Sequence, residues 1–376
     1  MKKLKVIVSG GGTGGHIFPA VSIANEIKER FPETEILFVG ALGKMEMERV
    51  PACGYRIVGL PVVGFPRSAS LKMVTFFWKL FQSMRLANKV INDFKPDVAI
   101  GVGGFASGPV LNAAVRKGVP AVLQEQNSYA GVTNKLLASK VNKICVAYPN
   151  MERYFPAEKI VVTGNPIRKN LIDSVVNKTE AYDYFKLNAE KPVVLVIGGS
   201  LGARSLNETM MANLEIIRQA DTQVLWQTGS YYYKEMLDRL GDNCPKNLQV
   251  MEFVSHMDLA YAVADVVISR AGAGTISELC LLGKASVLVP SPNVAEDHQT
   301  KNAMSLVENQ AALLIKDADS KEQLWPETFK LLADKQRLNS LSENIRKLAK
   351  PNAAKEIVDV IMGVVENQKS VVKEID

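Results

Sequence analysis

The residues best placed for chemistry form a glycine cluster that ends in a histidine. Gly10, Gly12 and Gly15 have the Gly-x-Gly-x-x-Gly spacing that lets backbone amides approach a phosphate or a sugar at a helix start. His16 follows directly, and the positive end of a helix disfavours an imidazolium there. We therefore predict a neutral His16 that serves as a general base, while a packed or helix-capping histidine remains the alternative.

The same cluster does not fit two common classes of nucleotide enzyme. A nicotinamide site needs an acidic residue at the end of the second strand for the ribose, but Val39 is followed by Gly40, Ala41 and Leu42. The chain also lacks the Gly-x-x-x-x-Gly-Lys-Ser/Thr loop of P-loop NTPases. A dehydrogenase and a P-loop NTPase are both disfavoured.

Two further glycine-rich segments follow predicted strands. Residues 101–108 could hold a second phosphorylated ligand, and Gly103, Gly104 and Ser107 are its candidate diphosphate contacts. Residues 269–278 combine small residues with Glu278, whose carboxylate could accept hydrogen bonds from two ribose hydroxyls. Tight turn packing and an ordinary helix-start glutamate are the structural alternatives.

Metal chemistry finds little support in the sequence. The three histidines and four cysteines lack ligand spacing, so we predict neither a metal nor a cofactor, and we expect His256 to be structural. Asp317 and Asp319 form the Asp-x-Asp pattern of metal-dependent sugar transferases. Their position just before a predicted helix start at Ser320 favours a turn and cap instead.

Composition and pattern predict two α/β domains. The length of 376 residues suits two domains with separate cores. Glycine clusters in both halves follow short apolar strands, which predicts two Rossmann-like domains whose parallel sheets face each other across a cleft. We expect strands at residues 5–9, 35–39, 98–102, 121–124, 143–147, 193–197, 223–227, 248–253, 266–269 and 286–289. We expect helices at residues 19–30, 275–282 and 353–368.

The predicted domains are residues 1–165, for the acceptor and membrane, and 166–349, for the nucleotide sugar. A hinge is expected at residues 162–168, and a C-terminal helix near 350–376 could pack back on the first domain. Basic residues exceed acidic ones in residues 1–165, whereas acidic ones are in excess beyond, so we expect no nucleic-acid partner.

One basic, aromatic stretch favours contact with a membrane surface. No acidic residue lies between Glu48 and Asp93, while seven Lys and Arg residues do. Together with apolar side chains, this predicts a patch that binds an anionic membrane surface. The predicted patch consists of Val63, Phe65, Phe77, Trp78 and Phe81. An ordinary core helix with a basic solvent face is the alternative. We find no signal peptide and no apolar run of spanning length, so a cytoplasmic protein is expected.

Taken together, these motifs resemble the MurG family, the bacterial N-acetylglucosaminyltransferases that form lipid II. The landmarks lie at residues 11–20, 101–109, 125–127, 164–168, 198–203, 270–278 and 297–303. The resemblance implies a GT-B fold and transfer of GlcNAc from UDP-GlcNAc to the MurNAc 4-hydroxyl of undecaprenyl-diphosphate-MurNAc-pentapeptide. It also implies a role in peptidoglycan synthesis, cell shape and division, on the cytoplasmic face of the inner membrane.

Residue roles follow from the same resemblance. Thr13, Gly14 and Gly15 would approach the donor sugar and diphosphate, Asn127 and Arg168 would bind the donor, and Ser200 would contact a phosphate. Val254 would lie in the uracil pocket, Glu278 would bind the ribose and Gln299 the sugar. Backbone groups of Ala273, Gly274, Thr275, Ile276 and Ser277 would line the pocket. Gln124 and His298 depart from the family pattern, where His and Gln respectively are frequent.

The expected mechanism is a direct, inverting displacement with His16 as base. The UDP leaving group would be stabilised by glycine-loop amides, helix N-termini and Arg168. Two alternatives stay open at this point: a related transferase that moves galactose from UDP-Gal to diacylglycerol, and a nucleotide-sugar sensor without catalysis.

Overall fold

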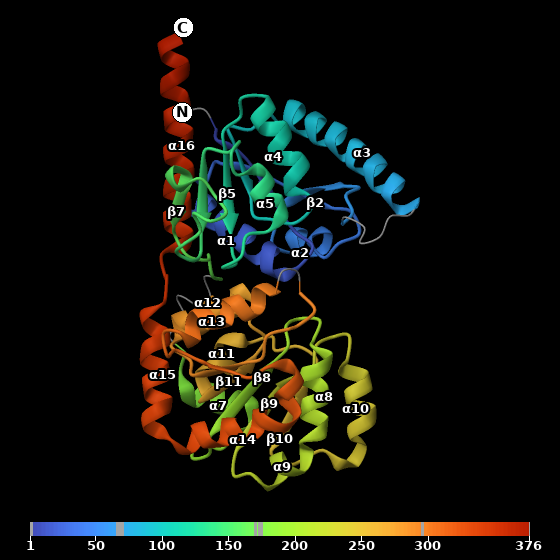
Figure 1. Cartoon of the computed structure of the whole chain (residues 1–376), viewed down its shortest axis with the longest axis vertical. Helices are drawn as coiled ribbons and strands as arrows, with labels where there is room; N and C mark the ends of the chain where they lie inside the picture. Colours follow the sequence, from blue (N-terminus) through green and yellow to red (C-terminus); the bar gives the residue numbers. More distant parts are fainter. Residues whose placement is uncertain (1–2, 65–70, 169–170, 172–175, 295–296, 376) are drawn as a thin grey trace. The chain divides into compact units, whose positions relative to one another are not determined.

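The computed structural model describes residues 3–64, 71–168, 171, 176–294 and 297–375 (Figure 1). They form two compact units: residues 1–168 with 351–376, and residues 169–350. We call these the first and the second unit. Phe65, part of the predicted membrane patch, lies outside the described residues.

The described part of the first unit contains a sheet of seven strands, all paired in parallel. Their order is β3-β2-β1-β4-β5-β6-β7. The strands are β1 (Lys5–Ser9), β2 (Glu35–Ala41), β3 (Arg56–Leu60), β4 (Val98–Gly101), β5 (Ala121–Glu125), β6 (Lys143–Val146) and β7 (Ile160–Val162). The apolar strands β1 and β4 are buried at the centre, as expected for a parallel sheet covered on both faces.

Helices cover both faces of this sheet. One core cluster includes side chains of α3 (Leu71–Phe94), α4 (Ser107–Arg116) and α5 (Val132–Leu137). The cluster on the other face includes side chains of α1 (Gly14–Arg30), α2 (Glu46–Ala52) and α16 (Ala353–Ile375). Helix α1 follows β1 and helix α2 follows β2, and the two strands are parallel. Both helices therefore start at the end of the sheet where these strands finish.

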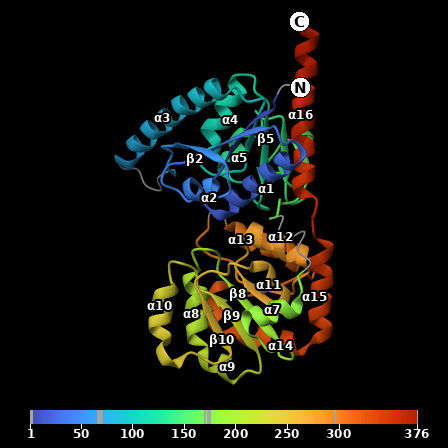
Figure 2. The same cartoon turned by 180° about the vertical axis from the view of Figure 1, so that it is seen from behind.

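The C-terminal helix returns to the first unit after the whole second unit. In both views α16 runs beside α1 (Figure 2). Ile357, Val358 and Ile361 are fully buried in the same core cluster as α1. An ion pair joins Arg30 to Asp359 at 2.7 Å. The first unit is thus built from two segments that are distant in sequence.

The second unit repeats the architecture with six described strands in the order β10-β9-β8-β11-β12-β13, again all parallel. The strands are β8 (Val193–Ile197), β9 (Gln223–Gln227), β10 (Leu248–Met251), β11 (Val266–Ser269), β12 (Ser286–Leu288) and β13 (Leu313–Leu314). The helices are α7 (Lys178–Phe185), α8 (Arg204–Ala212), α9 (Leu214–Gln219), α10 (Tyr233–Leu240), α11 (Met257–Val263), α12 (Ala273–Leu282), α13 (His298–Val307), α14 (Ser320–Ala333) and α15 (Lys335–Lys347).

The prediction of two Rossmann-like α/β domains is confirmed. Strands were predicted at all the central positions, with ends within two residues of those observed. The edge strands β3, β7 and β13 were missed: all three are mostly only partly buried, and β7 and β13 have only three and two residues, which is too short to show a strand period. Helices α1 and α12 begin earlier than predicted, at Gly14 and Ala273, because the glycine clusters themselves enter the first turn.

Candidate active site

The strand order reverses at one point in each sheet, and the glycine clusters follow the strands there. In the first unit β1 lies between β2 and β4, and in the second β8 lies between β9 and β11. Open parallel sheets bind ligands outside the carboxyl ends of the strands at such a switch point. The loops after β1, β4, β8 and β11 are therefore the candidate ligand-binding loops.

In the first unit, the two glycine loops touch each other. The first glycine loop spans residues 10–15, and the second spans residues 101–108. A β-carbon at Gly104 would lie 2.5 Å from the carbonyl oxygen of Gly11, and one at Gly103 would lie 2.9 Å from Nε2 of His16. Both positions also have positive φ. Only glycine allows this approach, which brings His16 against the second loop.

His16 lies in the first turn of α1. Its backbone N–H donates to the carbonyl oxygen of Thr13 at 3.1 Å, and its Nδ1 lies 3.4 Å from the Thr13 hydroxyl. The other ring nitrogen, Nε2, is the one that approaches Gly103. The imidazole is half-buried, so one edge of it remains accessible. This arrangement suits a group that accepts a proton from a ligand beside the second glycine loop.

Ser107 supports the second glycine loop from inside. It is fully buried, and its hydroxyl donates to the carbonyl oxygens of Gly103 at 2.8 Å and Ser9 at 3.0 Å. The hydroxyl proton is therefore used within the protein. Contact with a diphosphate stays a prediction for Gly103, Gly104 and Ser107.

A buried carboxylate that we did not predict as functional organises the neighbouring loop. Glu125 accepts hydrogen bonds from the Asn127 backbone at 3.1 Å, from Gly131 at 3.0 Å and from Asn134 at 2.9 Å. Asn127 is consequently held by its own loop. Arg168 ends the N-terminal segment of the first unit, and its guanidinium carbon lies 5.4 Å from the ring centroid of Phe18 on α1. We had assigned Arg168 to the second domain.

In the second unit, Gln227 connects two predicted donor-binding segments. Its Nε2 donates to Gly199, beside Ser200, at 3.1 Å, and its Oε1 accepts from the backbone of Val254 at 2.9 Å. The side chain is almost fully buried at the carboxyl end of β9. The predicted phosphate position and the predicted uracil position are thus joined by one side chain, which the sequence did not reveal.

Helix α12 presents Glu278 with a fixed orientation. The helix starts at Ala273, so the backbone amides of Ala273, Gly274 and Thr275 lie where an anion is favoured, whereas the Ile276 N–H donates to the carbonyl oxygen of Gly272. Glu278 accepts a hydrogen bond from the hydroxyl of Tyr261 at 3.0 Å, and Tyr261 itself is buried in α11. One carboxylate oxygen is therefore oriented by the protein.

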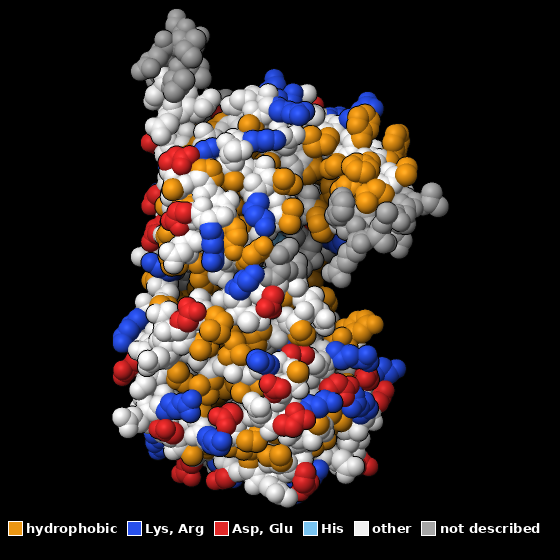
Figure 3. Space-filling model, in the orientation of Figure 1, with side chains coloured by type: hydrophobic (Ala, Val, Ile, Leu, Met, Phe, Trp, Pro, Cys, Tyr) orange, Lys and Arg blue, Asp and Glu red, His pale blue; other side chains and the backbone are white. Residues whose placement is uncertain are grey.

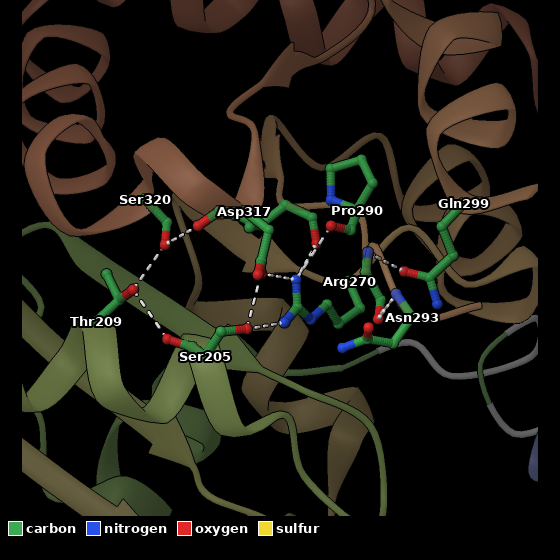
Figure 4. Close-up of polar contacts among 10 residues, drawn as sticks. Ser205, Thr209, Arg270, Pro290, Asn293, Gln299, Asp317 and Ser320 are labelled. Carbon is green, nitrogen blue, oxygen red and sulfur yellow. Dashed lines mark hydrogen bonds and ion pairs between the residues drawn. The ribbon is translucent and has the colours of Figure 1, made fainter. Parts of the chain in front are cut away.

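Arg270 joins the loops of the second unit (Figure 4). Its guanidinium donates to the carbonyl oxygens of Val289 at 2.9 Å and Pro290 at 3.2 Å, to Asp317 and to the Ser205 hydroxyl. Arg270 is 9% exposed, so these are buried charged contacts of the kind that are costly to break.

Asp317 therefore has a larger role than its predicted one. Residues 317–319 do form a turn before α14, but the Asp319 side chain makes no capping hydrogen bond. The carboxylate of Asp317 instead pairs with Arg270 and accepts from Ser205 at 2.7 Å. Gln299, in the first turn of α13, accepts a hydrogen bond from the backbone of Ser291 at 2.8 Å, so this predicted sugar contact lies against the loop after β12 (Figure 4).

Comparison with known proteins identifies the family. The model of the glycosyltransferase family 28 N-terminal domain matches residues 6–146, and that of the C-terminal domain matches residues 193–357. The chain belongs to glycosyltransferase family 28. Both family 28 domain models span the candidate ligand-binding loops of their unit, and the expected family membership is confirmed.

Full-length relatives bear names of one activity. A protein from Parabacteroides distasonis named UDP-N-acetylglucosamine–N-acetylmuramyl-(pentapeptide) pyrophosphoryl-undecaprenol N-acetylglucosamine transferase is 55% identical, covering 98% of this chain and all of its own length. The protein of the same name from Bacteroides thetaiotaomicron is 54% identical, covering 97% of this chain and 99% of its own. The solved structure of Acinetobacter baumannii MurG is 28% identical, with a TM-score of 0.75, covering 96% and 99% of the two chains.

The hydrogen bond between Tyr261 and Glu278 gives a direct test of the predicted ribose ligand. In Tyr261→Phe only the buried hydroxyl is lost, so Glu278 keeps its charge but loses an orienting donor. We expect the Kd for UDP to rise about fivefold, equivalent to roughly 1 kcal/mol for one hydrogen bond. Isothermal titration with UDP measures it.

Tyr184→Phe is the matched control, because Tyr184 is 52% exposed and lies on α7. Its Kd should stay at the wild-type value. An unchanged Kd in Tyr261→Phe, with UDP bound normally by the control, would contradict the role assigned to Glu278.

Proposed function

We propose that this chain transfers GlcNAc from UDP-GlcNAc to the 4-hydroxyl of MurNAc in undecaprenyl-diphosphate-MurNAc-pentapeptide, a step of peptidoglycan synthesis. The observation that carries this function is the identity of 50–55% to proteins named for this transfer, along almost their full lengths. The chemistry of the loops supports it, since they offer amides, hydroxyls and an imidazole, the kinds of group that a sugar transfer uses.

The second unit supplies most of the predicted donor contacts. Ser200, Val254, Glu278 and Gln299 all belong to the loops and helices that follow β8, β10, β11 and β12. Hydrogen bonds from three buried side chains, those of Gln227, Tyr261 and Arg270, hold these segments in place. A uridine nucleotide bound there would meet a preformed frame, which lowers the entropy lost on binding.

The first unit supplies the predicted base. As the acceptor oxygen attacks the anomeric carbon, its proton passes to His16, and the bond from that carbon to the UDP oxygen breaks. The configuration at the carbon inverts because attack and departure occur on opposite faces. Nε2 is the nitrogen that takes the proton, since it is the one beside the second glycine loop.

Removal of the imidazole tests this assignment. His16→Ala should lower kcat by about 10²- to 10⁴-fold, the usual contribution of a general base, with an unchanged Kd for UDP. His256→Ala is the control, because His256 lies in the second unit and packs edge-on against Tyr184, 5.1 Å between ring centroids. A His16→Ala enzyme with wild-type kcat would disprove the base assignment.

Helix α3 supports a membrane-bound location. On its N-terminal half, Val74, Phe77, Trp78 and Phe81 are more than half exposed and recur at helical spacing on one face. They gather as an apolar patch on that part of the surface (Figure 3). The guanidinium of Arg85 lies 5.9 Å from the Phe81 ring centroid, so a cation borders the patch.

We propose that this face binds the anionic cytoplasmic surface of the inner membrane, where the lipid acceptor resides. Exposed aromatic side chains insert at the interface, and adjacent basic residues attract anionic head groups. Val63, which also belongs to the predicted patch, lies on the segment before the helix and is half-buried. Among the described helices, none is both long and apolar enough to span a bilayer.

Polar substitutions on the exposed face of α3 test the membrane contact. The double variant Trp78→Ser and Phe81→Ser should bind vesicles containing anionic lipid at least tenfold more weakly, because it loses two inserting rings. Co-sedimentation measures the binding. Leu237→Ser, on the exposed side of α10, is the control and should bind as the wild type does. Equal binding by the double variant would contradict the proposal.

A further inference from the structure

A buried carboxylate lies beneath the first glycine loop. Glu46 is the first residue of α2 and is 0% exposed. Its Oε1 accepts a hydrogen bond from the Ala41 backbone at 2.9 Å, and its Oε2 accepts one from the Gly12 backbone at 2.8 Å. Both are charge-assisted bonds, stronger than those between neutral groups. The carboxylate therefore ties the first glycine loop to the end of β2.

Two glycines make room for this side chain. A β-carbon at Gly11 would lie 2.2 Å from the carboxylate carbon of Glu46, and one at Gly40 would lie 2.5 Å from its Cγ. Neither contact is possible for real atoms, so any side chain at these positions would displace Glu46. The spacing of glycines around residues 10–15 thus serves an internal anion as well as any ligand.

The internal anion also explains why the Gly12 amide does not face a ligand. In a dinucleotide site, the amides of such a loop point to the bound phosphates. Here the Gly12 N–H is already donated to Glu46. What the first loop offers to a substrate is therefore the following segment, Thr13 and the start of α1.

Contacts beyond Gly12 lead to His16. The carbonyl oxygen of Thr13, the next residue, accepts the His16 N–H at 3.1 Å. On the other side, Gly11 packs directly on Gly104, and Gly103 packs on the imidazole. A shift of the first loop at Gly11 and Gly12 would therefore move both the imidazole and the surface that it meets.

We propose that Glu46 is a positioning residue for the transfer reaction. Its buried carboxylate holds the first glycine loop in the position that keeps His16 against the second glycine loop, from where the imidazole can take the proton of the acceptor hydroxyl. The inference rests on the proposed function of His16 as base. Glu46 itself touches neither substrate, since it is fully buried under the loop.

Glu46→Gln tests it at nearly constant shape. In this variant one carboxylate oxygen is replaced by an NH₂ group. Because this group is a donor, it cannot accept the hydrogen bond from the backbone N–H that it faces, so that hydrogen bond is lost and the loop must move. We expect kcat to fall at least tenfold while the Kd for UDP, whose predicted contacts lie in the second unit, stays within twofold. Glu46→Asp, which keeps the charge on a shorter stem, should recover part of the loss.

The matched control is Glu48→Gln, an exposed position on the same helix, which should keep the wild-type kcat. A readout independent of activity is the amide resonance of Gly12 in a ¹⁵N-labelled enzyme. It should shift upfield and exchange faster with solvent in Glu46→Gln, because the charged acceptor is lost.

The outcomes separate this inference from the proposed function. If the wild type transfers GlcNAc and Glu46→Gln keeps its kcat while its Tm falls, Glu46 serves stability alone and the proposal is overturned. If Glu46→Gln does not fold, Glu46→Asp decides: a lowered kcat with normal UDP binding supports the proposal, and a wild-type kcat overturns it. If the wild type shows no transfer, the proposed function fails, and an unchanged Gly12 resonance would overturn the positioning role separately.

Discussion

The direct contact between two glycine loops is the constraint on which the first unit depends. A loop can pack on another loop within van der Waals distance of the backbone only where both lack side chains. Gly11 against Gly104 meets that condition, and the missing side chain at Gly103 lets the imidazole of His16 lie against the second loop. The strand order brings the two loops together. Strands β1 and β4 are neighbours in the sheet, although 88 residues lie between Ser9 and Val98 in the sequence. The imidazole is thereby placed beside a loop suited to an anion.

The second unit repeats this strand order and also has a close contact between glycines of two loops, where a β-carbon at Gly229 would lie 2.0 Å from the backbone nitrogen of Gly202. Buried polar side chains add to that contact: Gln227 and Arg270 each bond to two or more segments, and Tyr261 bonds to Glu278. A buried polar group without a hydrogen-bond partner costs free energy of folding, whereas a network in which every group is bonded fixes one arrangement of the backbone. A nucleotide site that must recognise a base, a ribose and a diphosphate together benefits from a frame that does not rearrange on binding.

Much of the fold could be predicted from sequence because its signals are local. The runs at β1 and β8 are continuous and apolar, and each is followed within a few residues by glycines and a helix. The site is less local. Glu46 and Gly12 are 34 residues apart, and neither has a neighbour in sequence that suggests their hydrogen bond. Asp317 was read as part of a turn for the same reason, since its partner Arg270 is 47 residues away. Roles that depend on such pairs emerge only once the strand order brings them together.

The central claim is transfer of GlcNAc to a lipid-linked acceptor, and product analysis tests it most directly. Purified enzyme would be incubated with radiolabelled UDP-GlcNAc and a short-chain analogue of undecaprenyl-diphosphate-MurNAc-pentapeptide, with radiolabelled UDP-Gal and diacylglycerol in a parallel reaction. We predict a labelled disaccharide lipid with inverted anomeric configuration from the first mixture and none from the second. Label transferred only to diacylglycerol, or UDP-GlcNAc bound without any labelled product, would contradict the account.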